Sequence, residues 1–123
     1  MRDFKKIRAW HRAHALSIAL HRLVRGFSRK GNSRLQAQLT NAADSVPANI
    51  VEGCGASTKK EFARFLEMSI KSANEAEYHL LSARDKLLIS PNDWQRYTAE
   101  TIEVRKMIYG YRKKLLQGDD EAE

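Results

Sequence analysis

Residues 35–80 read LQAQLTNAADSVPANIVEGCGASTKKEFARFLEMSIKSANEAEYHL, and this stretch decides the fold. Apolar residues recur in it every three or four positions, as they do along a helix that buries one face. The apolar positions of its first half are Leu35, Leu39, Ala42, Ala43, Val46 and Ile50. Gly53 and Gly55 then interrupt the pattern, and glycine is common where helices end. The stretch therefore predicts two helices joined by a short loop.

A helix-start signal follows the glycines. Thr58-Lys59-Lys60-Glu61 has the spacing of a capping box, in which the side chains at both ends satisfy free backbone amides. The core face of the helix that starts there is Phe62, Phe65, Leu66, Ser69, Ala73, Ala76, Leu80 and Leu87. In the preceding helix, Pro47 removes one backbone hydrogen bond, so we expect a bend between Ala43 and Pro47.

Two further helices flank this pair. Apolar positions repeat at helical spacing between Phe4 and Phe27, and the last helix begins at Ser90-Pro91-Asn92-Asp93 with a capping serine and an N-terminal proline. Short connections make neighbouring helices antiparallel. We expect an all-α, antiparallel up-down-up-down four-helix bundle over residues 1–118, with a proline kink in its second helix. Residues 119–123 are expected to form a disordered acidic tail.

The composition excludes several classes of protein. The 123 residues fit one domain, and the longest apolar run is far shorter than the ~20 residues of a membrane-spanning helix. The N-terminus, MRDFKKIRAW, lacks the apolar stretch of an export signal. Cys54 is the single cysteine, so no internal disulfide can form. We expect a soluble, cytoplasmic protein without membrane contact.

The sequence offers little for catalysis. No carboxylate lies three residues before any of the four histidines, so the Glu-x-x-His pairs of di-iron bundles are missing. Cys54 lies between two glycines at a predicted helix end, and no serine has the sequence context of a nucleophile. We therefore predict no enzyme activity, no metal and no cofactor. A metal site and an enzyme are the less favoured alternatives.

Positive charge is concentrated in the N-terminal part of the chain. The net charge is +7, and residues 1–34 hold ten of the 22 lysines and arginines against one acidic residue. A candidate phosphate-binding surface combines the outer face of the first helix, the following loop and the end of the last helix. Its residues are Arg8, Arg22, Arg25, Arg29, Lys30, Arg34, Arg112 and Lys113. Such a surface suits RNA or DNA, and a merely solvated basic face is the alternative.

Some apolar residues are displaced from the predicted core faces. Those of the last helix repeat at heptad spacing, and those of the third helix lie eleven and seven residues apart. The displaced residues are Ile18, Ile70, Leu81, Leu88, Ile102, Tyr109 and Leu116. Excess apolar surface of this kind predicts an interface between copies of the chain. A broad core with a few tolerated surface residues is the alternative.

The segment Ser45-Val46-Pro47-Ala48-Asn49-Ile50-Val51-Glu52-Gly53 resembles the Ser-Ile-Pro-x-Asn-Ile-Ala-Glu-Gly pattern of a bacterial protein family. That family is the four-helix-bundle family encoded in intervening sequences of 23S ribosomal RNA genes. The resemblance covers nearly the whole chain and implies a ring-shaped homopentamer. It also gives Pro47, Asn49, Glu52 and Gly53 a structural role, in which they shape the kinked helix and its end.

A related group, the accessory variability determinants of diversity-generating retroelements, resembles the same fold. In that group the basic ring surface is thought to bind a reverse transcriptase and nucleic acid, and neither group implies catalysis. Our leading hypothesis is a non-enzymatic, oligomeric, basic scaffold or adaptor that binds RNA, DNA or a nucleic-acid enzyme. The alternative is a protein–protein interaction module without nucleic-acid contact.

Overall fold

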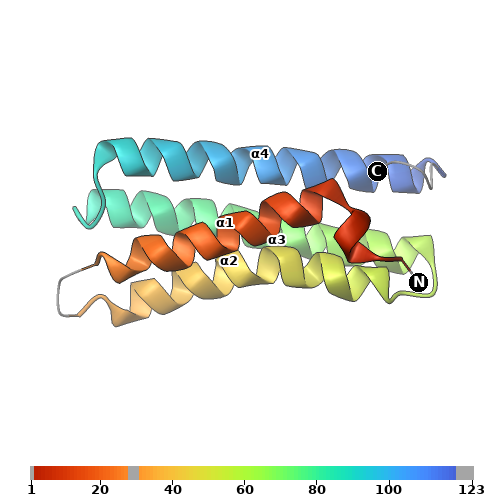
Figure 1. Cartoon of the computed structure of the whole chain (residues 1–123), viewed down its shortest axis with the longest axis horizontal. Helices are drawn as coiled ribbons and strands as arrows, with labels where there is room; N and C mark the ends of the chain where they lie inside the picture. The colour runs from red at the N-terminus through yellow and green to blue at the C-terminus, as the bar shows by residue number, and fades with distance from the viewer. Residues whose placement is uncertain (1, 28–30, 119–123) are drawn as a thin grey trace.

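Long helices packed side by side make up the fold (Figure 1). The computed structural model describes residues 2–27 and 31–118, and the predicted acidic tail at 119–123 lies outside them. A 3₁₀ turn, η1 (Phe4–Lys6), precedes α1 (Arg8–Arg25), α2 (Ser33–Cys54), α3 (Lys59–Asp85) and α4 (Pro91–Leu116). The described residues contain no strand, which confirms the all-α prediction.

The helices form a square bundle in which each helix packs against two neighbours. α2 packs against α1 and α3, and α4 packs against α3 and α1. The end of α1, the start of α2 and the α3–α4 turn lie at one end of the bundle (Figure 1). η1, the end of α4 and the α2–α3 loop lie at the other end (Figure 1). The antiparallel up-down-up-down bundle predicted from the short connections is confirmed.

Aliphatic side chains from all four helices fill the core. The largest fully buried ones are Leu20, Leu39, Val46, Ile50, Leu66, Leu80, Val104, Ile108 and Leu115. Each such side chain contributes roughly 1.5–3 kcal/mol through its removal from water. Alanines between them bring the helix backbones close, as at Ala43 of α2 and Ala73 of α3. Among the described helices, none is long and apolar enough to cross a membrane.

The predicted cap of α4 is present, and the predicted capping box of α3 is half formed, with the Thr58 side chain but not the Glu61 side chain bonded to a backbone amide within the described residues. Thr58 Oγ1 accepts a hydrogen bond from the Glu61 amide at 3.1 Å, and Ser90 Oγ accepts one from the Asp93 amide at 3.0 Å. The end of α3 differs from the prediction, because Leu87 adopts a φ of 60° and is exposed rather than in the core. Leu88 instead turns inward, where its amide donates to the Ala83 carbonyl.

The first helix also starts later than the sequence pattern predicted. Phe4 belongs to the separate turn η1, and Ile7 is extended before α1 begins at Arg8. The Asp3 carboxylate caps η1 by accepting from the Lys5 amide at 3.0 Å, while the Arg2 amide donates to the Cys54 carbonyl at 3.1 Å. The Arg2 contact ties the N-terminal segment to the end of α2, and the Asp3 cap closes a separate turn, so this segment does not continue α1.

Pro47 lies inside α2, which continues on both sides of it from Ser33 to Cys54. The predicted bend at this proline stays a prediction. Gly53 has a clearer structural role, because a Cβ atom there would lie 2.5 Å from Cδ1 of Phe62 and 3.1 Å from Cβ of Phe65. The Phe62 ring is itself buried against Tyr111, so it has little freedom to move. Only glycine allows α2 to approach the first turn of α3 this closely.

We expect Gly53→Ala to lower the free energy of unfolding by about 1–3 kcal/mol, because the new methyl group overpacks this contact. Gly110→Ala is the matched control, since Gly110 lies inside α4 and a Cβ atom there would have nothing within 4 Å. That control is expected to raise the free energy of unfolding by roughly 0.5–1 kcal/mol. Urea denaturation followed by circular dichroism measures both. Equal stability of the two variants would contradict the close approach.

Candidate functional site

Three exposed arginines lie at the end of the bundle where α1 connects to α2. Arg22 and Arg25 belong to the last turns of α1, and Arg34 is the second residue of α2. None of the three makes a hydrogen bond or an ion pair with a residue that the structure describes. We call this group the basic end. Of the other predicted cations, Arg29 and Lys30 lie outside the described residues.

The remaining predicted cations lie at the opposite end of the molecule. Arg8 opens α1, while Arg112 and Lys113 belong to the last turns of α4, which runs antiparallel to α1. Helix α1 alone spans 18 residues, or about 27 Å. The single positive stripe that the sequence suggested is therefore divided into two groups. Helix periodicity predicted which face each cation occupies, but not how far apart α1 and α4 place them.

Arg112 is not available to a phosphate in the way that the sequence suggested. Its Nε donates to the Ala63 carbonyl at 2.9 Å, and its Nη2 lies 3.5 Å from a carboxylate oxygen of Glu67. The side chain therefore links α4 to α3. Lys113, the next residue, is exposed.

Two more arginines are used in contacts between helices. Arg12 makes a bidentate pair with Glu100 at 2.8 and 2.9 Å, which joins α1 to α4. The hydrogen bond and the charge of Glu100 raise the pKa of Arg12. Arg105 joins α4 to α3 through Glu77 and Asn74. The sequence predicted neither contact, because a partner on another helix leaves no mark in the local sequence.

The predicted oligomer interface is only partly exposed. Tyr109 and Leu116 on α4 are 59% and 51% exposed. The half-buried members are Ile70, Leu81, Leu88 and Ile102. Tyr78 on α3, which the sequence analysis missed, is 63% exposed and lies with Leu81 beside a hollow of about 380 Å³. We call Tyr78, Leu81, Ile102, Tyr109 and Leu116 the apolar face.

Ile18 is separate from the apolar face. It lies on α1, is 42% exposed, and lines a hollow between α1 and α2. α1 packs against α2 and α4 but not against α3 within the described bundle. A ring of copies joins two different faces of each chain, so the assignment of Ile18 to the interface stays a prediction.

The hollow that contains Ile18 is an open groove of about 700 Å³ between α1 and α2. We call it the α1–α2 groove. Its lining residues are Phe4, Trp10, His14, Ser17, Ile18, His21, Arg22, Arg25, Asp44, Pro47, Ala48 and Val51. The groove adjoins the basic end, since Arg22 and Arg25 belong to both. Sequence reasoning missed it because a groove depends on how two helices are placed side by side.

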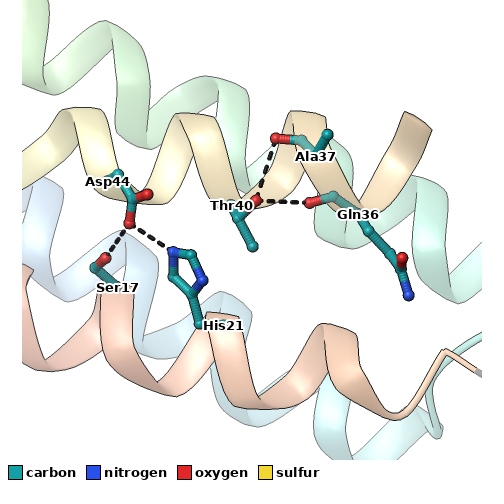
Figure 2. A network of polar contacts seen from close by, with 6 residues as sticks. All are labelled: Ser17, His21, Gln36, Ala37, Thr40 and Asp44. Carbon is teal, nitrogen blue, oxygen red and sulfur yellow. Dashed lines mark hydrogen bonds and ion pairs between the residues drawn. The ribbon is translucent and has the colours of Figure 1, made fainter. Parts of the chain in front are cut away.

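A polar network crosses the groove (Figure 2). Oδ1 of Asp44 on α2 accepts hydrogen bonds from Ser17 Oγ at 2.6 Å and from His21 Nε2 at 2.8 Å, both on α1 (Figure 2). This is not the order of a hydrolase triad, in which the serine bonds to the histidine and the carboxylate lies behind the histidine. Here the carboxylate lies between the two groups and fixes the spacing of α1 and α2.

The Pro47 motif makes contacts inside the fold. Asn49 Nδ2 donates to the carbonyl and to the hydroxyl of Ser45, both at 2.9 Å. Ser69 Oγ of α3 donates to the Val46 carbonyl at 2.6 Å. Glu52 is exposed, and its backbone carbonyl accepts from the Gly55 amide where α2 ends. The contacts of the motif therefore connect α2 to α3 and form the C-terminal end of α2.

The described part of the chain has few side chains placed to bind a metal ion or to act as a nucleophile. No three His, Cys, Asp or Glu side chains there are grouped so that they could hold a metal ion. Cys54 is only 3% exposed, and burial raises the pKa of its thiol. A thiolate is the reactive form of cysteine, so this environment disfavours a nucleophile.

The comparisons with known proteins agree with this geometry. The family model described as 23S rRNA-intervening sequence protein matches residues 5–110. The chain belongs to this family. A solved structure of the S23 ribosomal protein family, a protein of unknown function from Bacteroides thetaiotaomicron, has the same fold with a TM-score of 0.80. The two chains are 20% identical over 85% of this chain and 95% of that one. None of the curated proteins compared with this chain matches it.

In this member of the 23S rRNA-intervening sequence protein family, we expect native Cys54 to resist thiol reagents. At neutral pH, reaction with an aromatic disulfide reagent should be roughly 10²-fold or more slower than in urea, because only opened molecules expose the thiol. The absorbance of the released thiolate measures both rates. Equally fast reaction in the native protein would contradict the buried thiol and reopen the possibility of a nucleophile.

Proposed function

We propose that this chain is a non-enzymatic, oligomeric scaffold of the cytoplasm that binds RNA or DNA through its basic end. The observation that carries the proposal is that Arg22, Arg25 and Arg34 are exposed and have no acidic partner among the described residues. The fold uses Arg12, Arg105 and Arg112 in contacts between helices. Unlike these arginines, the three at the basic end make no contact between helices within the described residues.

Arginine suits this role because its guanidinium group forms paired hydrogen bonds to phosphate oxygens. Arg22 and Arg25 are three residues apart on α1, so they project from the same side of the helix. Arg34 projects from the start of α2, just beyond the connection between the two helices. Together they present positive charge to a phosphate backbone without specifying a base sequence.

The exposed side chains of the apolar face support the oligomeric part of the same proposal. The exposed rings of Tyr78 and Tyr109 lie on the adjacent helices α3 and α4, and aromatic residues of this kind are enriched at interfaces. A homopentamer would present five basic ends, and several weak contacts acting together raise apparent affinity by roughly 10²–10⁴-fold. A nucleic-acid enzyme such as a reverse transcriptase is a second partner of the proposed scaffold.

The apolar face also favours one alternative, a protein–protein interaction module without nucleic-acid contact. The most exposed large apolar side chains of the described residues are Leu87 and Tyr78. Tyr78 lies in the second half of α3, and Leu87 lies just after that helix ends. A partner protein that covers them would need no contribution from the basic end. Neutralising the basic end therefore separates the two functions.

We expect the combined substitution Arg22→Gln, Arg25→Gln and Arg34→Gln to weaken binding of a labelled RNA strand. Three fewer phosphate contacts should reduce the slope of log affinity against log salt by about 2. Fluorescence anisotropy titrations at several salt concentrations measure this slope. The matched control is Lys60→Gln, Arg64→Gln and Lys71→Gln, which removes the same charge from exposed positions of α3. Equal losses in both variants would mean that only net charge matters, and the basic end would not be the site.

We expect the wild-type chain to form an oligomer with a mass near five times the chain mass of 14.1 kDa. Tyr109→Glu should dissociate it, because the substitution places a charge in the apolar face. Light scattering measures both masses. Asn41→Glu is the control, since it introduces the same charge at an exposed position of α2, a helix that carries none of the apolar face. A monomeric wild-type chain would refute the oligomer.

A further inference from the structure

We propose that the α1–α2 groove holds an unstacked base of a single-stranded nucleic acid, while the neighbouring phosphates lie on Arg22 and Arg25. This inference rests on the proposed function and names the form of nucleic acid that the site selects. Three features of the groove support it: its hollow shape, an open aromatic stack at one end, and a separation of charge along its length.

The groove is hollow because α2 contributes only small or compact side chains to it. Pro47 is buried, while Ala48 is exposed and Val51 is half-buried. The resulting space of about 700 Å³ falls within the roughly 300–1,000 Å³ of sites that hold small molecules. It is large enough for a base and its sugar, whereas the paired bases of a duplex are stacked inside the helix and cannot enter.

Aromatic rings form a stack at the N-terminal end of the groove. The rings of Trp10 and His14 are parallel to within 8°, with their centres 5.0 Å apart. Phe4 packs edge-on against Trp10 at 4.8 Å and holds the indole in place. His14 is exposed, and no other ring within the described residues contacts it. A base that stacks on the second face of this ring extends the stack, and stacking on such rings is how proteins hold single strands.

Negative and positive side chains occupy different positions along the groove. The Asp44 carboxylate lies between the aromatic stack and the arginines, fixed by Ser17 and His21 through one of its two oxygens. Its negative charge disfavours a phosphate in the middle of the groove, and its second oxygen is an acceptor for a base N–H group. Arg22 lies about 12 Å along α1 from His14, so phosphates next to a bound base reach the basic end.

The test uses the full chain with Trp94→Phe, which leaves Trp10 as the only tryptophan. The probes are a short oligoadenylate RNA, the same strand paired with oligouridylate, and inorganic polyphosphate. We expect the single strand to quench Trp10 fluorescence, because the bound base extends the stack. Duplex and polyphosphate are expected to bind the arginines, as shown by competition with a labelled strand, without quenching Trp10.

Ala48→Leu fills the groove from an exposed helix position. We expect it to abolish the quenching and to weaken single-strand binding by roughly 5- to 150-fold, which corresponds to the ~1–3 kcal/mol of one stacked base. Binding of polyphosphate should not change. Ala99→Leu is the matched control, since it places the same side chain at an exposed position of α4 outside this groove. It should leave both quenching and affinity unchanged.

The outcomes distinguish failure of the groove from failure of the proposed function. Single-strand binding that Ala48→Leu does not affect, with no quenching of Trp10, overturns the groove and leaves the basic end as a phosphate site. Quenching by polyphosphate equal to that by RNA also overturns it. Quenching by an oligoglutamate peptide at lower concentration than by RNA would identify the groove as a site for an acidic protein segment. Absence of any RNA binding in the anisotropy titration overturns both proposals.

Discussion

The close approach of α2 to α3 at Gly53 is the constraint on which the bundle depends. It places the backbone of α2 against the buried ring of Phe62, and the contact continues along both helices through Ser69 and the Val46 carbonyl. The α2–α3 pair has the most extensive contact in the bundle, whereas α1 and α4 share the least. α1 and α4 are therefore positioned by the central pair rather than by each other, and Arg12 with Glu100 joins them across that smaller contact.

The arginines of this protein have two different uses. Those that face a neighbouring helix are paired with carboxylates and a backbone carbonyl, where the pairing offsets the loss of hydration. Those at the basic end are exposed and have no partner among the described side chains. An unpaired, exposed arginine adds little to the stability of the bundle, which is why the proposed phosphate contacts are assigned to these residues.

The α1–α2 groove depends both on the packing of the helices and on the charges of their side chains. The same Asp44 contact that fixes the spacing of α1 and α2 also sets the electrostatics of the groove. Pro47 belongs to the motif that carries the family resemblance, and it lies on the floor of the groove beside Ala48. A helix that is short of bulky side chains on this face leaves space where a continuous apolar stripe would have closed it.

The sequence by itself determined the helices, their order and the N-terminal caps of α3 and α4, because periodicity and capping are local properties that a few neighbouring residues specify. It was wrong about Leu87 and about the start of α1, where tertiary contacts of Leu88 and Arg2 decide the path of the chain. Only the tertiary structure separated Arg22 and Arg25 from Arg112, engaged Arg112 with Ala63, and created the groove. These features depend on the distances between helices, which are set when side chains far apart in the sequence pack together.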